Sequence, residues 1–456
     1  MPRRDSEPMN EWVDAEGRVE RAHELYETGQ WAAAAAELQQ AITVNPYNAA
    51  WHFNLGLTLE ALEEFANACK AYRAALELAP DDVETLNCLG VNLTRLGQYA
   101  EALDCFRRIE KIDASYEPSY CNRIVTYAEM GQHDEAEVMF YLAQQLTQEC
   151  PLCYYNMGNS LYTRGRYDRA IYCWRKSLEL DADHPHANVR IAEALWAQGE
   201  LDEARKSFQA ELKLCPTDPD VLVDYGELLG DLELWDEAEA KYRRALELVP
   251  EHTLAHFALG ELAIRRNQPG DAEKHFRRVL KADGDFPGVH AKLAEALLRQ
   301  GRVQRAARHL LAELRRCGDD PATLRDLGEL LIEAHLVHHA NGVLRRLVRL
   351  VPDDPYAQLS LAVTFLRMNR LDDGIRHCRK ALKLKPHYSA ALYELALAHL
   401  RKGQVPRARR YAARALTLAP DDDRVLRLSR RLGVVGFWMR LRRRLNTHRH
   451  GRTIRD

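Results

Sequence analysis

The sequence predicts an all-α fold built from tandem helix pairs, and three observations carry this prediction. A unit of 34 residues repeats twelve times between Ala15 and Asp422 without an insertion. Within each unit, apolar residues recur at spacings of three and four over two segments of about a dozen residues, the spacing typical of amphipathic helices. Small residues and prolines stand at fixed places of the unit. A period of this length is typical of solenoids made of stacked helix pairs.

The two helices of a unit are expected to meet at two small residues. The eighth place is Gly or Ala in every unit except the fourth, which has Ile124, and the twentieth place is Ala in every unit except the eleventh, which has Gly374. We expect these small side chains to let the helices approach closely. A larger side chain at the twenty-fourth place, such as Phe106 or Trp174, is expected to fill the gap to the next unit.

The second helix is expected to end near the thirty-second place of the unit. Proline lacks an N–H group and clashes with the preceding turn, so it stops a helix. An acidic pair such as Asp81-Asp82 is then expected to cap the next helix and to suit its positive N-terminal end. The thirty-second place is proline in seven units, at Pro46, Pro80, Pro216, Pro250, Pro352, Pro386 and Pro420.

The repeat divides the chain into four parts. Residues 1–14 are expected to be a flexible extension, and residues 15–422 one cooperative solenoid, since a single helix pair cannot bury its apolar faces alone. Residues 423–432 begin like a thirteenth first helix and are expected to cap the last repeat. Residues 433–456 follow as a basic amphipathic tail, in which apolar residues are interleaved with arginines. Its candidate contact residues are Trp438, Arg440, Arg442, Arg443 and Arg444.

These motifs make the chain similar to the tetratricopeptide-repeat family, over 408 of its 456 residues. The resemblance implies a right-handed superhelix of antiparallel helix pairs with a concave inner groove. It also implies that the first helix of each pair lines the groove, near its second, fifth, sixth, ninth, twelfth and thirteenth places.

Repeats two to five carry amide and aromatic residues at these places. Amide side chains both donate and accept hydrogen bonds, which suits gripping the main chain of an extended peptide. The groove of O-GlcNAc-transferase-like repeat arrays is similar, although we expect no transferase domain after these repeats, so that only the peptide-gripping part would apply. Helix capping and hydrogen bonding between repeats are the alternative roles. The candidate residues are Phe53, Asn54, Asn87, Asn122, Tyr155, Asn156, Asn159 and Tyr162.

Repeats six to ten carry glutamate at the ninth place. Stacking would align these carboxylates in an acidic stripe that favours a basic partner. Alternatively they form helical ion pairs, since Arg265 follows Glu261 and Arg299 follows Glu295 by four residues, an arrangement worth about 0.2–0.5 kcal/mol. The stripe comprises Glu193, Glu227, Glu261, Glu295 and Glu329.

Several function classes find no support in the sequence. Chaperone-binding members of the family hold a C-terminal carboxylate with a clamp of basic and amide residues at the fifth and ninth places, which here hold residues such as Phe53 and Leu57. No nucleophile elbow, phosphate loop or zinc-protease helix is recognisable. We therefore expect no enzyme, no cofactor and no small-molecule substrate.

The cysteines offer one weak metal signal. Cys150 and Cys153 form the sole Cys-x-x-Cys of the sequence, and His184 and His186 occupy almost the same junction one repeat later. Two thiolates and two imidazoles are compatible with zinc, but ordinary packing at the junction is the favoured interpretation, and no metal site is predicted. The remaining cysteines sit mostly in helical patterns, so reduced thiols and a cytoplasmic location are expected.

The net charge of -3 conceals a polarised chain. Residues 1–250 carry -22 and residues 251–456 carry +19. Two alternatives follow: self-assembly of an acidic half on a basic half, or contact of the tail with a membrane surface or nucleic acid. The tail also suits docking on an acidic protein or folding back as a cap. The main prediction is a non-enzymatic adaptor whose groove binds an extended, basic segment of a partner protein.

Overall fold

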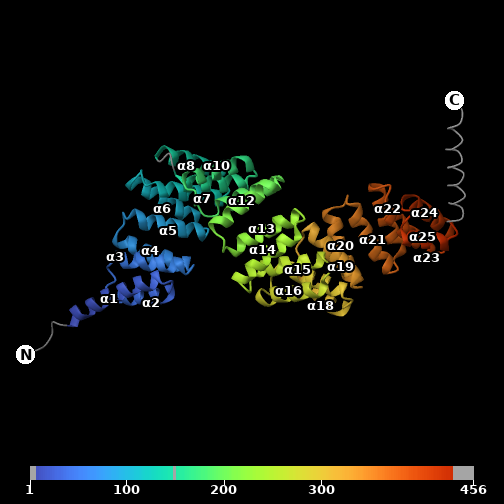
Figure 1. The fold of residues 1–456 in the computed structure, drawn as a ribbon, viewed down its shortest axis with the longest axis horizontal. Helices are drawn as coiled ribbons and strands as arrows, with labels where there is room; N and C mark the ends of the chain where they lie inside the picture. Colours follow the sequence, from blue (N-terminus) through green and yellow to red (C-terminus); the bar gives the residue numbers. More distant parts are fainter. Residues whose placement is uncertain (1–6, 147–149, 435–456) are drawn as a thin grey trace, which may run out of the picture. The chain divides into compact units, whose positions relative to one another are not determined.

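The structure, a computed structural model, describes residues 7–146 and 150–434. Within these residues it contains helices and no β-strand, which confirms the all-α prediction. The chain divides into two units, and the boundary after Leu234 falls inside the seventh repeat. In each unit, consecutive helices lie side by side in antiparallel pairs (Figure 1).

The first unit holds thirteen of the described helices. The earliest begins at Glu7, so a helix enters the segment 1–14 that we expected to be flexible. The helices of this unit are α1 (Glu7–Glu27), α2 (Trp31–Val44), α3 (Ala49–Ala61), α4 (Phe65–Leu78), α5 (Val83–Arg95), α6 (Tyr99–Ile112), α7 (Glu117–Glu129), α8 (His133–Leu146), α9 (Pro151–Thr163), α10 (Tyr167–Leu180), α11 (Ala187–Gln198), α12 (Leu201–Leu214) and α13 (Pro219–Asp231).

The second unit holds the other twelve described helices. The last of them packs on its predecessor through the buried Val425 and Leu428. The helices of this unit are α14 (Trp235–Leu248), α15 (Thr253–Arg265), α16 (Pro269–Ala282), α17 (Val289–Arg299), α18 (Val303–Arg316), α19 (Pro321–Glu333), α20 (Val337–Leu350), α21 (Pro355–Arg367), α22 (Leu371–Leu384), α23 (Ser389–Arg401), α24 (Val405–Leu418) and α25 (Asp423–Arg431).

The helix boundaries follow the predicted signals. Helix α4 ends at Leu78, two residues before Pro80, and the side chain of Asp82 accepts a hydrogen bond from the Thr85 N–H group at the start of α5, at 3.3 Å. The same capping role falls to Asp218, Asp320, Asp354 and Asp422 at later repeat junctions. These caps satisfy N–H groups that the helices themselves leave unpaired.

The turn inside each repeat requires a residue with a left-handed backbone conformation (positive φ) at the fifteenth place. Glycine supplies it at seven of the twelve positions, and Gly97, for example, has φ of 72°. The other five positions hold larger residues, including Glu63 and His335, both in the same left-handed region. The turn geometry is therefore imposed by the packed helix pair and not by glycine alone, since non-glycine residues enter this region only at a cost.

The core contact inside a repeat involves the residue that we expected to fill the gap to the next unit. The large residue at the twenty-fourth place lies against the eighth-place glycine of its own repeat. A Cβ atom added to Gly90 would lie 2.6 Å from the ring of Phe106, and Gly158 has the same relation to the indole of Trp174. Both aromatic side chains are fully buried.

Gly90→Ala is therefore expected to destabilise the chain by about 1–3 kcal/mol, the usual cost of overpacking a core. Gly342 is the matched control, because it also lies inside a helix but nothing stands within 4 Å of an added Cβ. Gly342→Ala should stabilise the chain by up to about 1 kcal/mol through helix propensity. Urea denaturation of both variants checks this, and equal shifts in the same direction would contradict the close-packing account.

In the second unit, arginines at the thirteenth place link successive first helices. Arg299 donates to the Ile264 carbonyl at 2.7 Å, and Arg401 donates to the Leu366 carbonyl at the same distance. Arg367 contacts Ile332 in the same way. Each bond satisfies a carbonyl near the C-terminal end of a helix, where helices leave acceptors unpaired. These contacts hold neighbouring first helices together on one face.

Candidate functional site

An acidic hollow lies between the first helices α17 and α19 of the second unit, and Glu313 of the second helix α18 also lines it. Its volume is about 410 Å³. The places that line it include the sixth and ninth of both repeats, which the sequence analysis assigned to the groove. The acidic side chains lining it are Glu295, Glu313, Asp326, Glu329 and Glu333, with Lys292 the one lysine among them. Successive first helices thus bring carboxylates from neighbouring repeats into one concavity.

The predicted glutamate stripe is partly balanced by basic side chains. Glu295 pairs with Arg299 at 2.7 Å, as the alternative interpretation expected. Glu261 pairs with Lys292 of the next repeat at 2.6 Å, and not with Arg265 as that interpretation expected. Arg265 instead lies over the ring of Trp235. Pairing across repeats therefore competes with pairing along one helix.

A second acidic cluster lies on α11 and α13 of the first unit. Glu193 is half-buried and pairs with Arg190 at 2.9 Å, whereas Glu227 is exposed. Burial, together with the nearby charges of Glu227 and Glu193, raises the pKa of Asp224 to about 6. A carboxyl group whose ionisation is opposed by its surroundings favours a cation beside it.

Sequence reasoning missed Asp224, although the signal was available. Asp224 occupies the sixth place of its repeat, the same place that Asn54, Asn122 and Asn156 occupy in theirs. Asp326, in the hollow of the second unit, holds the sixth place too. The acidic surface therefore uses the sixth place as well as the ninth.

The raised pKa of Asp224 predicts a pH-dependent stability. The folded chain holds this proton up to about pH 6, whereas an unfolded aspartate loses it near 3.8. The folded state therefore binds more protons in this window, and its stability falls as the pH rises from about 4 to above 6. After a discount for partial exposure, Asp224→Asn should be more stable than the parent chain by about 1 kcal/mol at pH 7 and by little at pH 4.

Thermal unfolding at several pH values measures this difference. Asp183→Asn, at an exposed turn residue, is the control and should change little with pH relative to the parent chain. If the difference in stability between Asp224→Asn and the parent chain stayed constant from pH 4 to 7, Asp224 would have an ordinary pKa.

The predicted amide residues contact neighbouring repeats. Asn122 donates to the side-chain oxygen of Asn87 at 2.9 Å, and Asn156 donates to the Cys121 carbonyl at 3.4 Å. Asn159 accepts a hydrogen bond from the indole N–H of Trp174 at 3.2 Å. Asn54 is exposed. Bonding between repeats, the alternative role, therefore occupies part of this amide set.

The predicted aromatic residues are half-buried and pack mainly on their own unit. Phe53 lies against the buried core of the first repeats, with its ring 5.8 Å from that of Tyr72. Tyr155 stacks on His184 at 4.6 Å, and Tyr162 packs near Trp174. The exposed part of each of these half-buried rings is the surface that a ligand could contact.

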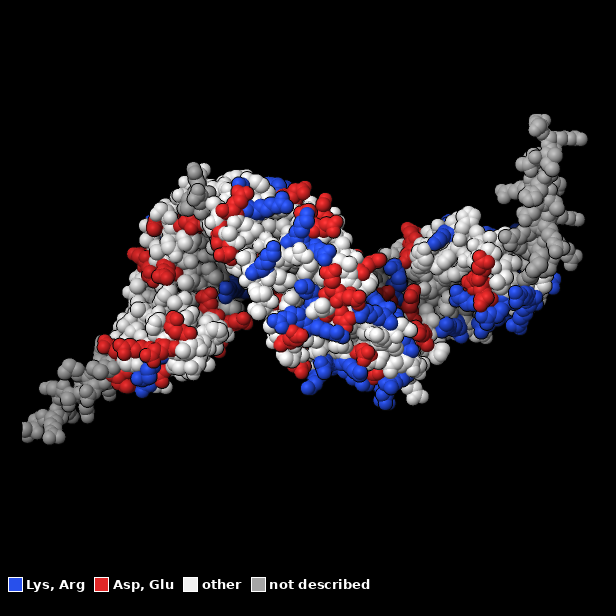
Figure 2. Space-filling model, in the orientation of Figure 1, with Lys and Arg blue, Asp and Glu red and all other residues white. Residues whose placement is uncertain are grey.

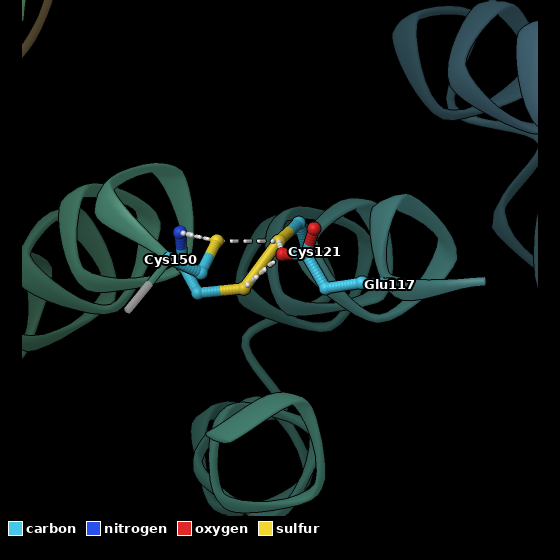
Figure 3. A group of neighbouring side chains, drawn as sticks. Glu117, Cys121 and Cys150 are labelled. Atoms are coloured by element: carbon cyan, nitrogen blue, oxygen red, sulfur yellow. Dashed lines mark hydrogen bonds between the residues drawn. A yellow bond between two sulfur atoms is a disulfide. The ribbon is translucent and has the colours of Figure 1, made fainter. Parts of the chain in front are cut away.

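The structure places Cys150 and Cys153 with partners that the sequence did not indicate. In the described residues, the group of potential metal ligands comprises Glu117, Cys121, Cys150 and Cys153, and it contains neither His184 nor His186. Cys121 and Cys153 form a disulfide in the structure, so the expectation of reduced thiols is wrong for this pair (Figure 3).

The tail residues Trp438, Arg440, Arg442, Arg443 and Arg444 lie outside the described residues. In the described part, Lys and Arg side chains gather at the C-terminal end of the second unit (Figure 2). Helices α24 and α25 supply exposed arginines there, including Arg407, Arg410, Arg414, Arg424 and Arg427. None of the helices within 7–146 and 150–434 has both the length and the apolar character needed to cross a membrane.

Comparison with known families identifies the repeat. A family model described as Tetratricopeptide repeat matches residues 19–83, 155–219, 225–285, 257–321, 325–389 and 361–423, and a second model of the same description matches residues 83–109. No curated protein sequence matches the chain.

Several solved structures resemble the chain at low identity. The APC/C hetero-tetramer Cut9–Hcn1 has 14% identity and a TM-score of 0.43, covering 90% of this chain and 95% of that chain. The pilF protein of Pseudomonas aeruginosa has 22% identity and a TM-score of 0.41, covering 46% and 96%. Yeast Tom70 has 14% identity and a TM-score of 0.38, covering 94% and 97%.

Proposed function

The chain belongs to the tetratricopeptide-repeat family. From this premise we propose that it is a non-enzymatic adaptor, which binds an extended, basic segment of a partner protein along its first helices. The observation that carries the proposal is the acidic hollow between α17 and α19. A concavity lined by carboxylates of successive repeats suits an extended chain with Lys or Arg side chains, since complementary charge favours and orients such encounters.

The acidic cluster of the first unit supports the same partner chemistry. Burial and the nearby charges of Glu227 and Glu193 both oppose the ionisation of Asp224 and raise its pKa. A bound ammonium or guanidinium group would offset both effects and favour the ionised carboxylate. The partner's cationic side chains would therefore gain more at this cluster than at an isolated surface carboxylate.

The amide residues would contribute contacts to the partner's main chain. Each asparagine offers two N–H donors and an oxygen with two lone pairs. The bonds from Asn122 to Asn87 and from Asn156 to the Cys121 carbonyl use one donor of each amide. The remaining capacity, with the exposed Asn54 and the edge of Tyr155, is available to an extended peptide.

The experiment is a pull-down or a peptide array with Asn122 and Asn156 both changed to alanine. We expect the double variant to lose most partner binding while its helical content stays unchanged. The matched control changes Asn67 and Gln39, exposed residues of second helices, to alanine. Unchanged partner binding by the Asn122 and Asn156 double variant would reject the amide part of the groove assignment.

We further propose that the chain has no catalytic activity, binds no cofactor and lies in the cytoplasm. Self-association of the acidic half with the basic half, and contact of the basic tail with a membrane surface or nucleic acid, are the alternatives. The groove is preferred because the hollow and the Asp224 cluster are built from described residues that share repeat places.

A further inference from the structure

Three cysteines and a glutamate converge where repeats four and five meet. Glu117 and Cys121 lie one turn apart on α7, whereas Cys150 and Cys153 belong to the start of α9. Their ligand atoms all lie within 4.8 Å of one another. The cysteines are buried and Glu117 is half-buried, and Figure 3 shows Glu117, Cys121 and Cys150 pointing toward one another. This is a compact set of three sulfurs and one carboxylate.

Two helix N-termini face this cluster. Glu117 is the first residue of α7, and Cys150 caps α9, where its Sγ accepts a hydrogen bond from the Cys153 N–H group at 3.1 Å. The N-terminal end of a helix carries partial positive charge and favours anions. Both helix ends therefore suit a set of anionic ligands around a metal ion.

The carboxylate of Glu117 would gain no hydrogen bond from the sulfur atoms of a disulfide. Its Oε1 lies 2.9 Å from the Sγ of Cys121 and 3.4 Å from the Sγ of Cys153. These distances suit a thiol donating its proton to a carboxylate, but disulfide sulfurs carry no proton. Packing a carboxylate on two sulfur atoms is favourable only if they are thiols or if a cation lies among them.

We propose that the reduced chain binds one zinc ion through Cys121, Cys150, Cys153 and Glu117. Thiolate and carboxylate are zinc ligands, and four protein ligands make a closed, structural site. Zinc bound to thiolates at about 2.3 Å would hold sulfur atoms slightly less than 4 Å apart, close to the 3.5 Å between Cys121 and Cys150. The ion and the Cys121–Cys153 disulfide exclude each other, because the metal needs both thiolates.

The ion would fix two neighbouring first helices at the amide zone. Asn122 follows Cys121 directly, and Asn156 donates to the Cys121 carbonyl. Ligands from α7 and α9 would therefore hold the spacing of these two amides. The site itself does not depend on the proposed function, because zinc uptake can be measured without any partner.

The experiment loads the full-length chain, reduced and kept under anaerobic conditions, with zinc alone. We expect one equivalent of bound zinc, and a cobalt-substituted chain with the spectrum of a tetrahedral thiolate site. Cys121→Ser and Cys153→Ser should each weaken zinc binding by about 100-fold or more, and Glu117→Gln by about tenfold, as loss of a ligand or of its charge usually does.

Cys317→Ser is the matched control, because Cys317 is a half-buried cysteine outside the cluster, and it should bind zinc as the parent chain does. Circular dichroism without metal separates loss of a ligand from loss of fold. The proposal is overturned if the reduced parent chain takes up no zinc. It is also overturned if the folded Cys121→Ser and Cys153→Ser variants bind zinc like the parent chain, or if the cobalt spectrum is octahedral.

Discussion

Trp174→Ala is expected to destabilise the first unit by about 3–5 kcal/mol, the usual cost of emptying a large buried site. The indole is fully buried and lies directly on Gly158 of the same repeat. Its N–H group donates to the Tyr155 carbonyl and to the Asn159 side chain, both at 3.2 Å. The substitution therefore removes core contacts and leaves a half-buried amide oxygen without this donor.

Tyr172→Ala is the matched control, because Tyr172 lies on the same helix, two residues earlier, and is 58% exposed. Its expected effect is within about 0.5 kcal/mol, as for most surface substitutions. Urea denaturation followed by circular dichroism gives both values. If both variants lost a similar free energy of unfolding, the packing of α10 on α9 would not be the source of this stability.

Neutralising the acidic hollow is expected to weaken the binding of a basic peptide about tenfold or more. The variant combines Asp326→Asn, Glu329→Gln and Glu333→Gln, all exposed residues that line the hollow. Exposed charge pairs contribute about 0.2–1 kcal/mol each, so three of them together contribute about 0.6–3 kcal/mol, a range that includes the 1.4 kcal/mol that a factor of ten requires. The probe is a short fluorescent peptide of alternating Lys and Ser.

The control removes the same number of charges elsewhere in the second unit. Glu251→Gln, Asp353→Asn and Asp421→Asn change exposed turn residues between repeats. Affinity of this triple variant should stay near that of the parent chain, and the difference between the two triple variants should shrink as salt is added, because salt screens exposed charges. If both triple variants lost the same peptide affinity, the peptide would be attracted by the net charge of the chain alone.

The repeat pattern predicted the helices because each signal acts locally. Pro80 follows the end of α4, and Asp82 caps α5 through chemistry that involves only its neighbours in sequence. The small residue at the eighth place also predicted a close approach, and the ring of Phe106 lies there against Gly90. The turn residue escaped prediction, because Glu63 and His335 adopt a positive φ that their side chains do not favour.

The features that sequence reasoning missed join residues about one repeat apart. Glu261 reaches Lys292 instead of Arg265, because neighbouring first helices approach closely on one face. The Cys-x-x-Cys motif supplied half of the sulfur cluster, but Glu117 and Cys121 enter it from the preceding first helix. Spacing within one helix cannot indicate such partners, since the stacking of repeats decides them.

Site-specific photo-crosslinking tests the central claim, that partners bind along the first helices, most directly. A photoreactive amino acid would replace Asn156 or Asp326 on first helices, and Tyr172 or Arg349 on second helices, before the chain captures partners from its native host. We expect crosslinked partner peptides, rich in Lys or Arg, from the first-helix positions and none from the second-helix positions. Crosslinks from the second-helix positions alone would contradict it.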